Sequence, residues 1–297
     1  MLAQQLVNGV LLGATYALFA LGFTLMFGVL RVINLTYGFY FSAGALLALW
    51  LTKSFGLSIW AALPLASLGA GGIAVVLDAL LLTRLRRLQA PELSFLMVTL
   101  GGVLALYAAL AAWLGTDIRR LPPGVISADA WTLAVPGGDV RITAAQVLIL
   151  GATTVLVAAL VALMQGTRLG LAIRAMAEKP DAAQLMGIDT GRAAALVSFV
   201  SGCLAGAGGV LIGLNFNAIH PYMGETMMLR GFVVIIVGGM GDLRGAVIAG
   251  FALGIIEVMT AGYLSSGLKE AVAFLILVVV LWTRPAGLFG RAVVRRA

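Results

Sequence analysis

Long apolar stretches follow one another along almost the whole chain, with only short polar segments between them. A helix needs about 20 mostly apolar residues to cross a bilayer, and most of these stretches approach that length. Two of them, 34–52 and 227–240, are short, so we expect one to be a half-helix or a re-entrant segment enclosed by protein. The pattern predicts an all-α polytopic membrane protein with about eight to nine transmembrane helices. The spans are expected at residues 5–29, 34–52, 57–82, 93–114, 144–164, 193–215, 227–240, 245–262 and 266–283.

The composition excludes several other classes of protein. Hydrophobic residues make up 62% of the 297 residues and charged residues 10%, and the mean hydropathy is +1.09, far above that of soluble domains. One cysteine, Cys203, and one histidine, His220, cannot form an intrachain disulfide or a Cys/His metal site. The glycine-rich run Gly238–Ala246 lacks the Lys and Ser or Thr of a phosphate-binding loop, so we expect a tight turn between two helices there. No aromatic and basic surface for nucleic acid and no convergent catalytic set is visible.

The basic residues predict which loops face the cytoplasm, because loops rich in Lys and Arg remain on that side. Three segments qualify: TRLRRLQ around Arg84, residues 165–192, and the tail RPAGLFGRAVVRRA. The loop 115–143 carries balancing charges and several prolines, so we expect it outside. The alternation then puts the N-terminus outside and the C-terminus in the cytoplasm. We expect a single transmembrane domain, 1–297, in which 165–192 is a cytoplasmic loop and 115–143 an extracytoplasmic loop.

Residues 165–192 form a polar, charged insertion in this apolar chain. Its seven charged side chains would together cost roughly 20 kcal/mol in lipid, at about 3 kcal/mol each, so the segment must lie in water. Apolar residues still recur at helical spacing, which predicts two short amphipathic helices. Pro180 and Asp181 suit the first turn of the second helix, and Gly187 suits its end. The apolar positions are Leu169, Ile173 and Met176 in the first helix and Ala182, Leu185 and Met186 in the second.

A helix pair of this kind can dock into a groove on another protein. The alternative is a pair that rests on the lipid headgroups. The sequence favours the docking role, because the pair is small and its polar face is only partly basic.

Polar residues inside or beside the apolar spans are candidates for a transport path. Glu257 lies near the middle of its span, where an ionisable group costs about 2–3 kcal/mol unless it is paired or hydrated. The alternative is a protonated or hydrogen-bonded Glu257 that serves packing alone. Asn34, Tyr37 and Asn215 stand at the ends of spans, where an interfacial position is the commoner explanation. The candidate path residues are Asn34, Tyr37, Gly38, Asn215 and Glu257.

Glycines recur four residues apart inside several spans, for example Gly9 and Gly13, or Gly250 and Gly254. Such spacing lets two helices approach closely in a membrane. We therefore expect packing seams at these positions.

The segment DAAQLMGI, Asp181 to Ile188, resembles the EAA-x-x-x-G coupling loop of binding-protein-dependent ABC importer permeases. Ala182, Ala183 and Gly187 match the motif, and Asp181 stands where Glu is usual. Over nearly its whole length the chain resembles the LivH-type permeases of branched-chain amino acid importers. The matching segments are YALFALGFTLMFGVLRVIN, TRLGLAIRAMAEKPDAAQLMGID, SGCLAGAGGVL, FVVIIVGGMGDLRGAVIAG and RPAGLFG.

The resemblance implies a permease subunit of the bacterial inner membrane that forms part of a translocation pathway by alternating access. It implies a LivM-like sister permease, two cytoplasmic ABC ATPases and an extracytoplasmic solute-binding protein as partners, with homodimerisation left open. ATP and Mg would be bound by the ATPases, and this chain would bind no cofactor and catalyse no reaction. The resemblance also assigns ATPase coupling to the loop 165–192, with Arg168, Arg174, Glu178, Asp181, Ala182, Ala183, Gly187 and Ile188 as its candidate residues.

One departure from the family pattern bears on the substrate. The chain reads INLTYG where family members commonly read INFAHG, so Tyr37 replaces a histidine. A phenol keeps a hydrogen-bonding group but is larger and does not titrate near neutrality. The expected substrate is therefore leucine, isoleucine or valine, with urea, short amides and aromatic acids as alternatives. An ion-coupled secondary transporter or channel that works without ATPases is the alternative function, favoured by Glu257 alone.

Overall fold

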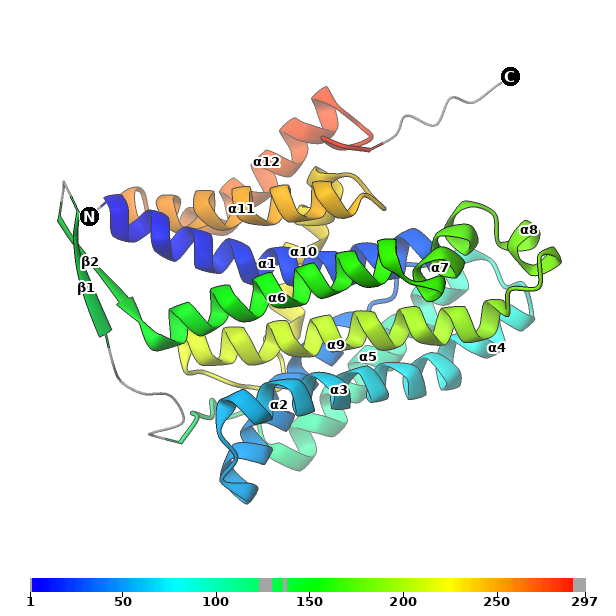
Figure 1. Ribbon diagram of the computed structural model, residues 1–297, viewed down its shortest axis with the longest axis horizontal. Helices are drawn as coiled ribbons and strands as arrows, with labels where there is room; N and C mark the ends of the chain where they lie inside the picture. The colour runs from blue at the N-terminus through cyan, green and yellow to red at the C-terminus, as the bar shows by residue number, and fades with distance from the viewer. Residues whose placement is uncertain (1, 123–129, 136–137, 291–297) are drawn as a thin grey trace.

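Helices make up nearly all of the structure, a computed structural model that describes residues 2–122, 130–135 and 138–290 (Figure 1). The predictions for residues 123–129, 136–137 and 291–297, which include the last arginines of the tail, lie outside the described residues. The helices are α1 (Leu2–Leu30), α2 (Tyr37–Phe55), α3 (Ile59–Leu77), α4 (Thr83–Arg87), α5 (Glu92–Leu114), α6 (Ala144–Gly166), α7 (Arg168–Glu178), α8 (Pro180–Leu185), α9 (Thr190–Phe216), α10 (Met223–Gly238), α11 (Leu243–Tyr263) and α12 (Lys269–Thr283). The strands are β1 (Ala130–Val135) and β2 (Gly138–Thr143), and single turns of π and 3-10 helix form η1 (Asp78–Leu82) and η2 (Ser266–Leu268).

Helix α1 runs through the centre of the bundle and is buried over most of its length. Helix α11 packs against α1 and runs in the opposite direction. Small residues at the contact let the two backbones approach closely. A Cβ on Gly9 would lie 2.8 Å from the Ile255 Cα, and one on Gly13 would lie 2.7 Å from the Phe251 Cα. The packing seam predicted from the glycine spacing is therefore present between these helices.

Helix α9 is the second buried helix, and α2 and α3 pack along it. Its glycines again stand at the contacts. A Cβ on Gly202 would lie 2.5 Å from the Cβ of Ala74 in α3, and one on Gly209 would collide with the carbonyl oxygen of Phe41 in α2. Larger side chains at these positions would push α2 and α3 away from the centre of the bundle.

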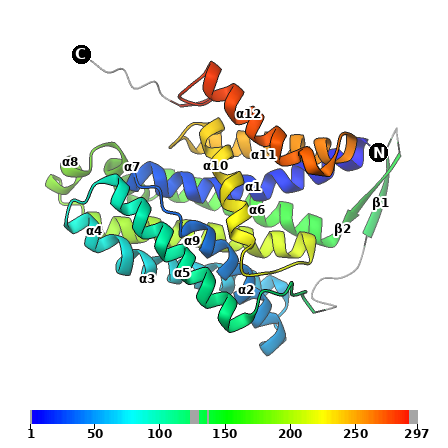
Figure 2. The same cartoon turned by 180° about the vertical axis from the view of Figure 1, so that it is seen from behind.

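Helices α2 and α10 begin in the interior of the protein. The Tyr37 hydroxyl, at the start of α2, donates to the carbonyl oxygen of Phe19 in the middle of α1 (2.9 Å). At the start of α10, the Gly224 amide donates to the Ser42 hydroxyl of α2 (2.8 Å), so the two helices begin beside each other. In both views α10 runs across the direction of α1 and α9 (Figures 1 and 2). The sequence predicted a half-helix or re-entrant segment at 34–52 or 227–240, and the helices at both places begin inside the protein.

Among the described residues, seven helical segments are long and apolar enough to cross a membrane. Helices α2 and α10 fall short of this measure, as do the short polar helices α7 and α8. The expected eight to nine spans are thus approximate. The outer helices α5, α6 and α12 expose apolar side chains, such as Leu104, Val155 and Trp282. A polytopic membrane protein needs such faces for lipid or for a neighbouring subunit.

The two ends of the bundle are built differently. At one end, which we call the hairpin end, β1 and β2 form an antiparallel hairpin. Gln4 of α1 holds it through two hydrogen bonds with the Arg141 backbone (2.8 and 3.2 Å). At the opposite end, which we call the α8 end, lie α4, α7 and α8 (Figure 1). The sequence analysis expected only a loop at 115–143, although the β-branched and aromatic residues on either side of Pro-Gly-Gly are typical of a hairpin.

Candidate functional site

Helices α7 and α8 form the predicted pair at the α8 end, and α7 is fixed firmly to the bundle. Thr167 caps α7 by accepting a hydrogen bond from the Gly170 amide (3.0 Å). Gly170 lies directly against the backbone of α6, and Ile173 and Met176 are buried. The apolar positions predicted for this helix therefore face the bundle, except Leu169, which is half exposed.

Arg31 connects α7 to the end of α1. Its guanidinium donates to the carbonyl oxygens of Ala177 (3.0 Å) and Glu178 (3.2 Å), which are among the unpaired acceptors at the C-terminal end of α7. A cation at this end also suits the helix dipole. The sequence analysis missed Arg31, and its lone positive charge between two apolar spans was the available signal.

Helix α8 begins and ends as predicted. Pro180 occupies its first turn, and Gly187 ends it with φ at +85°. The Ile188 amide donates to the Ala183 carbonyl (3.1 Å) and the Gly187 amide to the Gln184 carbonyl (3.0 Å), which is the Schellman pattern. This pattern needs a left-handed residue at the glycine position.

The surface of α8 presents apolar side chains outward. Leu185 is 90% exposed and Met186 is 84% exposed, while Ala183 is buried against the bundle. The candidate coupling residues Arg168, Arg174, Glu178, Asp181, Ala182 and Gly187 are also exposed, and Ile188 is half-buried. An exposed apolar tip within a charged surface is a feature of docking helices.

A cleft of about 740 Å³ separates α8 from η1 and α4. On its wall the buried Asp78 pairs with Arg86, whose Nη1 lies 3.0 Å from Asp78 Oδ2, and the Ser198 hydroxyl donates to the same carboxylate (3.0 Å). The π-helical turn η1 begins at Asp78, and such turns occur frequently at functional sites. The sequence analysis used this arginine only to orient the chain and overlooked the aspartate inside the span 57–82.

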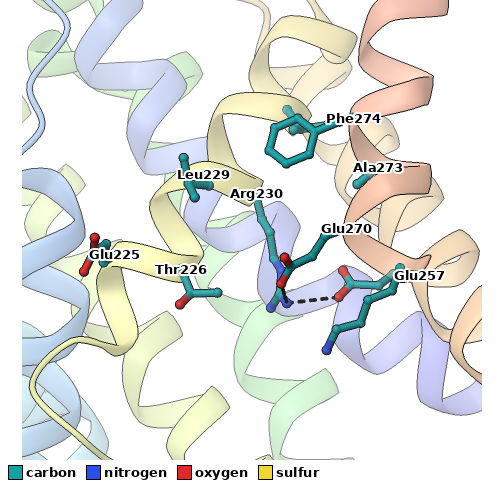
Figure 3. A pocket seen from close by; sticks show the side chains of 10 residues that line it. Glu225, Thr226, Leu229, Arg230, Glu257, Glu270, Ala273 and Phe274 are labelled. Atoms are coloured by element: carbon teal, nitrogen blue, oxygen red, sulfur yellow. Dashed lines mark ion pairs between the residues drawn. The ribbon is translucent and has the colours of Figure 1, made fainter. Parts of the chain in front are cut away.

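Glu257 is buried and belongs to a polar cluster between α1, α10, α11 and α12 (Figure 3). The Tyr16 hydroxyl donates to Glu257 Oε2 (2.6 Å), and Arg230 Nη2 lies 3.2 Å from Glu257 Oε1. The same Arg230 nitrogen lies 3.7 Å from Glu270 Oε1. Glu257 is thus both hydrogen-bonded and ion-paired, and the sequence analysis missed Arg230, a lone cation in the short span 227–240.

The other candidate path residues do not share one place. Asn34 and Tyr37 are buried inside the protein. Asn34 accepts hydrogen bonds from the Thr36 amide (3.0 Å) and hydroxyl (2.5 Å), which shapes the segment that leads into α2. Gly38 lies against the backbone of Gly224, and a Cβ on it would be 2.8 Å from that carbonyl oxygen. These residues form the junction at which α2 and α10 begin.

Asn215 lies apart from both groups. It lines a cavity of about 300 Å³ together with Asn8, Leu12 and Val258. The five candidate path residues are therefore divided among the α2–α10 junction, the Arg230 cluster and this separate cavity.

Comparison with known proteins gives a consistent result. The family profile described as "Branched-chain amino acid transport system / permease component" matches residues 5–281. The high-affinity branched-chain amino acid transport permease LivH of Escherichia coli (strain K12) is 31% identical over 99% of this chain and 97% of its own length. The permease BraD of Pseudomonas aeruginosa PAO1 is 30% identical over the same shares. The nucleoside ABC transporter permease NupB of Lactococcus lactis is 25% identical over 39% of this chain and 32% of its own. No solved structure matches the chain.

Proposed function

The chain belongs to the family of permease components of branched-chain amino acid transport systems, and from this premise we propose that it carries leucine, isoleucine or valine through the membrane. It is a multi-pass permease subunit of an ABC importer, and it is not an enzyme. An importer of this class works with ATPases and a binding protein. We propose two ATPases that bind ATP and Mg, an extracytoplasmic binding protein and a LivM-like sister permease. The relatives named for branched-chain amino acids support this choice of substrate.

We further propose that α7 and α8 transmit the motion of the ATPases to the transmembrane helices. The observation that carries this proposal is the contrast between the two helices. The tip of α8 exposes Leu185 and Met186, whereas α7 is attached to α1 through Arg31 and to the bundle through Ile173 and Met176. A force applied at the tip would therefore reach α1, α6 and α9 and drive alternating access.

The proposed orientation has the α8 end in the cytoplasm and the hairpin end outside. The α8 end carries Arg84, Arg86 and Arg87 in α4 and Arg168 and Arg174 in α7. This concentration of positive charge supports the orientation, since such loops remain in the cytoplasm. The C-terminus would then be cytoplasmic as well, because the Leu288 amide bonds to the end of α10 at this side.

The ion-coupled alternative receives no support from the comparisons. Glu257, which favoured it, already has a hydrogen bond and a cationic partner. A carboxylate paired in this way is a weak candidate for the coupling ion's only ligand.

The experiment that tests the coupling role is the variant Leu185→Asp in the complete importer. A charge at the apolar tip of α8 should prevent the ATPases from copurifying with the permeases and abolish ATP-dependent uptake. Leu88→Asp is the matched control, because Leu88 is 70% exposed at the same end but lies outside α8. Copurification and uptake that are unaffected by Leu185→Asp would refute the coupling role.

A further inference from the structure

A small cavity between α10, α11 and α12 is lined by Arg230 and Glu270, whose charged groups lie 3.7 Å apart (Figure 3). We propose that this cavity is a subsite for a zwitterionic amino acid, in which Arg230 binds the α-carboxylate and Glu270 binds the α-ammonium group. The inference rests on the proposed function, because it assumes an amino acid substrate. It adds the residues that would recognise the charges common to all such substrates.

The cluster lies deep along the bundle. Tyr16, which bonds to Glu257, is the fifteenth of the 29 residues of α1 and therefore marks the middle of the longest helix. Charged groups near the middle of a membrane are costly and mark substrate or ion pathways by default. An ion pair of Arg230 with Glu257 alone would suffice for packing, so the second carboxylate needs another explanation.

Glu270 is far more exposed than Glu257. Glu257 is 5% exposed, whereas Glu270 is 62% exposed. Glu270 is also the fifth residue of the apolar segment Ser266–Thr283, which is long enough to cross a membrane. Glu270 therefore lies near the end of this segment, and its charge keeps this side of α12 against water or another protein rather than hydrocarbon. Where this side meets water, a polar solute can enter the cavity.

Arg230 pairs unequally with the two carboxylates. Arg230 lies 3.2 Å from Glu257 but 3.7 Å from Glu270, at the outer limit of an ion pair. A zwitterion fits between Arg230 and Glu270 once the exposed Glu270 side chain swings outward, and it would replace this long contact with two shorter ones. The exchange leaves the charge of the cavity unchanged, because the ligand has no net charge. Glu257, held by Tyr16, would keep the guanidinium in place and act as a positioning residue.

The walls of the cavity match the rest of such a ligand. Leu229, Val233 and Phe274 provide apolar surface beside the charged groups. The volume is about 210 Å³, below the ~300–1,000 Å³ of pockets for drug-sized ligands and on the scale of a single amino acid. Two further charged residues, Glu225 and Lys269, also line the cavity. Figure 3 shows Glu225 apart from the cluster of Arg230, Glu257 and Glu270.

The test uses protection of a cysteine in the assembled importer, reconstituted in proteoliposomes without its binding protein. Thr226 lines the cavity and is exposed, so Thr226→Cys in a Cys203→Ala background should react with a water-soluble methanethiosulfonate reagent. Leucine at about ten times its dissociation constant leaves roughly one site in eleven free, so labelling should slow about tenfold. The desamino analogue 4-methylpentanoate should protect far less, because it lacks the group that Glu270 binds.

Two variants make the result specific. Glu270→Gln should abolish protection by leucine, and its exposed side chain makes misfolding a weak explanation for that loss. Ser54→Cys, exposed at the end of α2 and remote from the cavity, should be labelled at the same rate with and without leucine. Equal protection by leucine and 4-methylpentanoate, unchanged protection in Glu270→Gln, or equal slowing at Ser54→Cys would each overturn the subsite.

Uptake of labelled leucine by the complete importer, measured in parallel, separates this inference from the proposed function. If the importer takes up leucine but leucine does not protect Thr226→Cys from labelling, the subsite is refuted and the proposed function stands. Absence of leucine uptake by the unmodified importer would instead refute the proposed function.

Discussion

Gly187 provides a graded test of the coupling helix, because its requirement is one of backbone conformation alone. Its φ is +85°, and a Cβ added there would meet no atom within 4 Å. A side chain at this position therefore creates no clash and costs only the strain of the left-handed region. That strain is about 1–2 kcal/mol for an ordinary residue and up to ~3 kcal/mol for a β-branched one. Asn tolerates the conformation and should cost least.

These magnitudes convert into a population of intact turns. A strain of about 2 kcal/mol shifts the equilibrium toward a broken turn roughly 30-fold, since each 1.4 kcal/mol is a factor of ten. Breaking the turn releases the bonds from the Ile188 and Gly187 amides and frees the tip of α8. We therefore expect uptake per ATP hydrolysed to be close to that of the unmodified chain in Gly187→Asn, lower in Gly187→Ala and lowest in Gly187→Val.

The assay measures leucine uptake and ATP hydrolysis together in proteoliposomes that hold equal amounts of the complete importer. Insertion and thermal unfolding should be unchanged in all three variants, because the turn is exposed at the end of the bundle. Unchanged uptake in Gly187→Val would show that the turn does not transmit the motion. Equal losses in Gly187→Asn and Gly187→Val would show that the surface of Gly187, rather than its conformation, is what matters.

Three further predictions concern packing and buried charge. Gly44→Ala should destabilise the protein by about 1–3 kcal/mol through overpacking, because its Cβ would collide with α9. Gly151→Ala is the control: its Cβ meets no neighbour, so the change should be neutral or stabilising. Thermal unfolding in detergent compares the two variants. Arg86→Met should cost about 3 kcal/mol by leaving a buried carboxylate without its cation, and the exposed control Arg84→Met should stay within about 0.5 kcal/mol in denaturation of the purified protein. Glu257→Ala should cost about 3 kcal/mol, because the guanidinium of its partner in α10 keeps only an exposed carboxylate; an unfolding temperature equal to that of the unmodified chain would contradict the buried pair.

Much of the fold could be predicted because the membrane imposes simple rules. A crossing helix must be long and apolar, so the spans were readable within a few residues, as for α11 (Leu243–Tyr263), expected at 245–262. The turn at Gly187 was predictable because few residues other than glycine adopt its conformation. The glycines of α1 and α11 also followed from spacing, since small residues mark close helix contacts.

The pairings were not predictable, because they depend on which helices become neighbours. Arg230 and Glu257 lie 27 positions apart on different helices, and no periodicity relates them. Arg31 reaches α7 across a sequence separation of 146 residues. Asp78 and Arg86 are closer in sequence, but their meeting depends on the π-helical turn η1, which the hydrophobic pattern does not indicate.

The central claim is that this chain is a passive path and lever, powered by other subunits. The most direct measurement is uptake of labelled leucine into proteoliposomes that contain this chain, its sister permease, the ATPases and the binding protein, with urea and an aromatic acid as comparators. The account predicts leucine uptake that requires ATP and every component. ATP-independent uptake of leucine by this chain alone would contradict it.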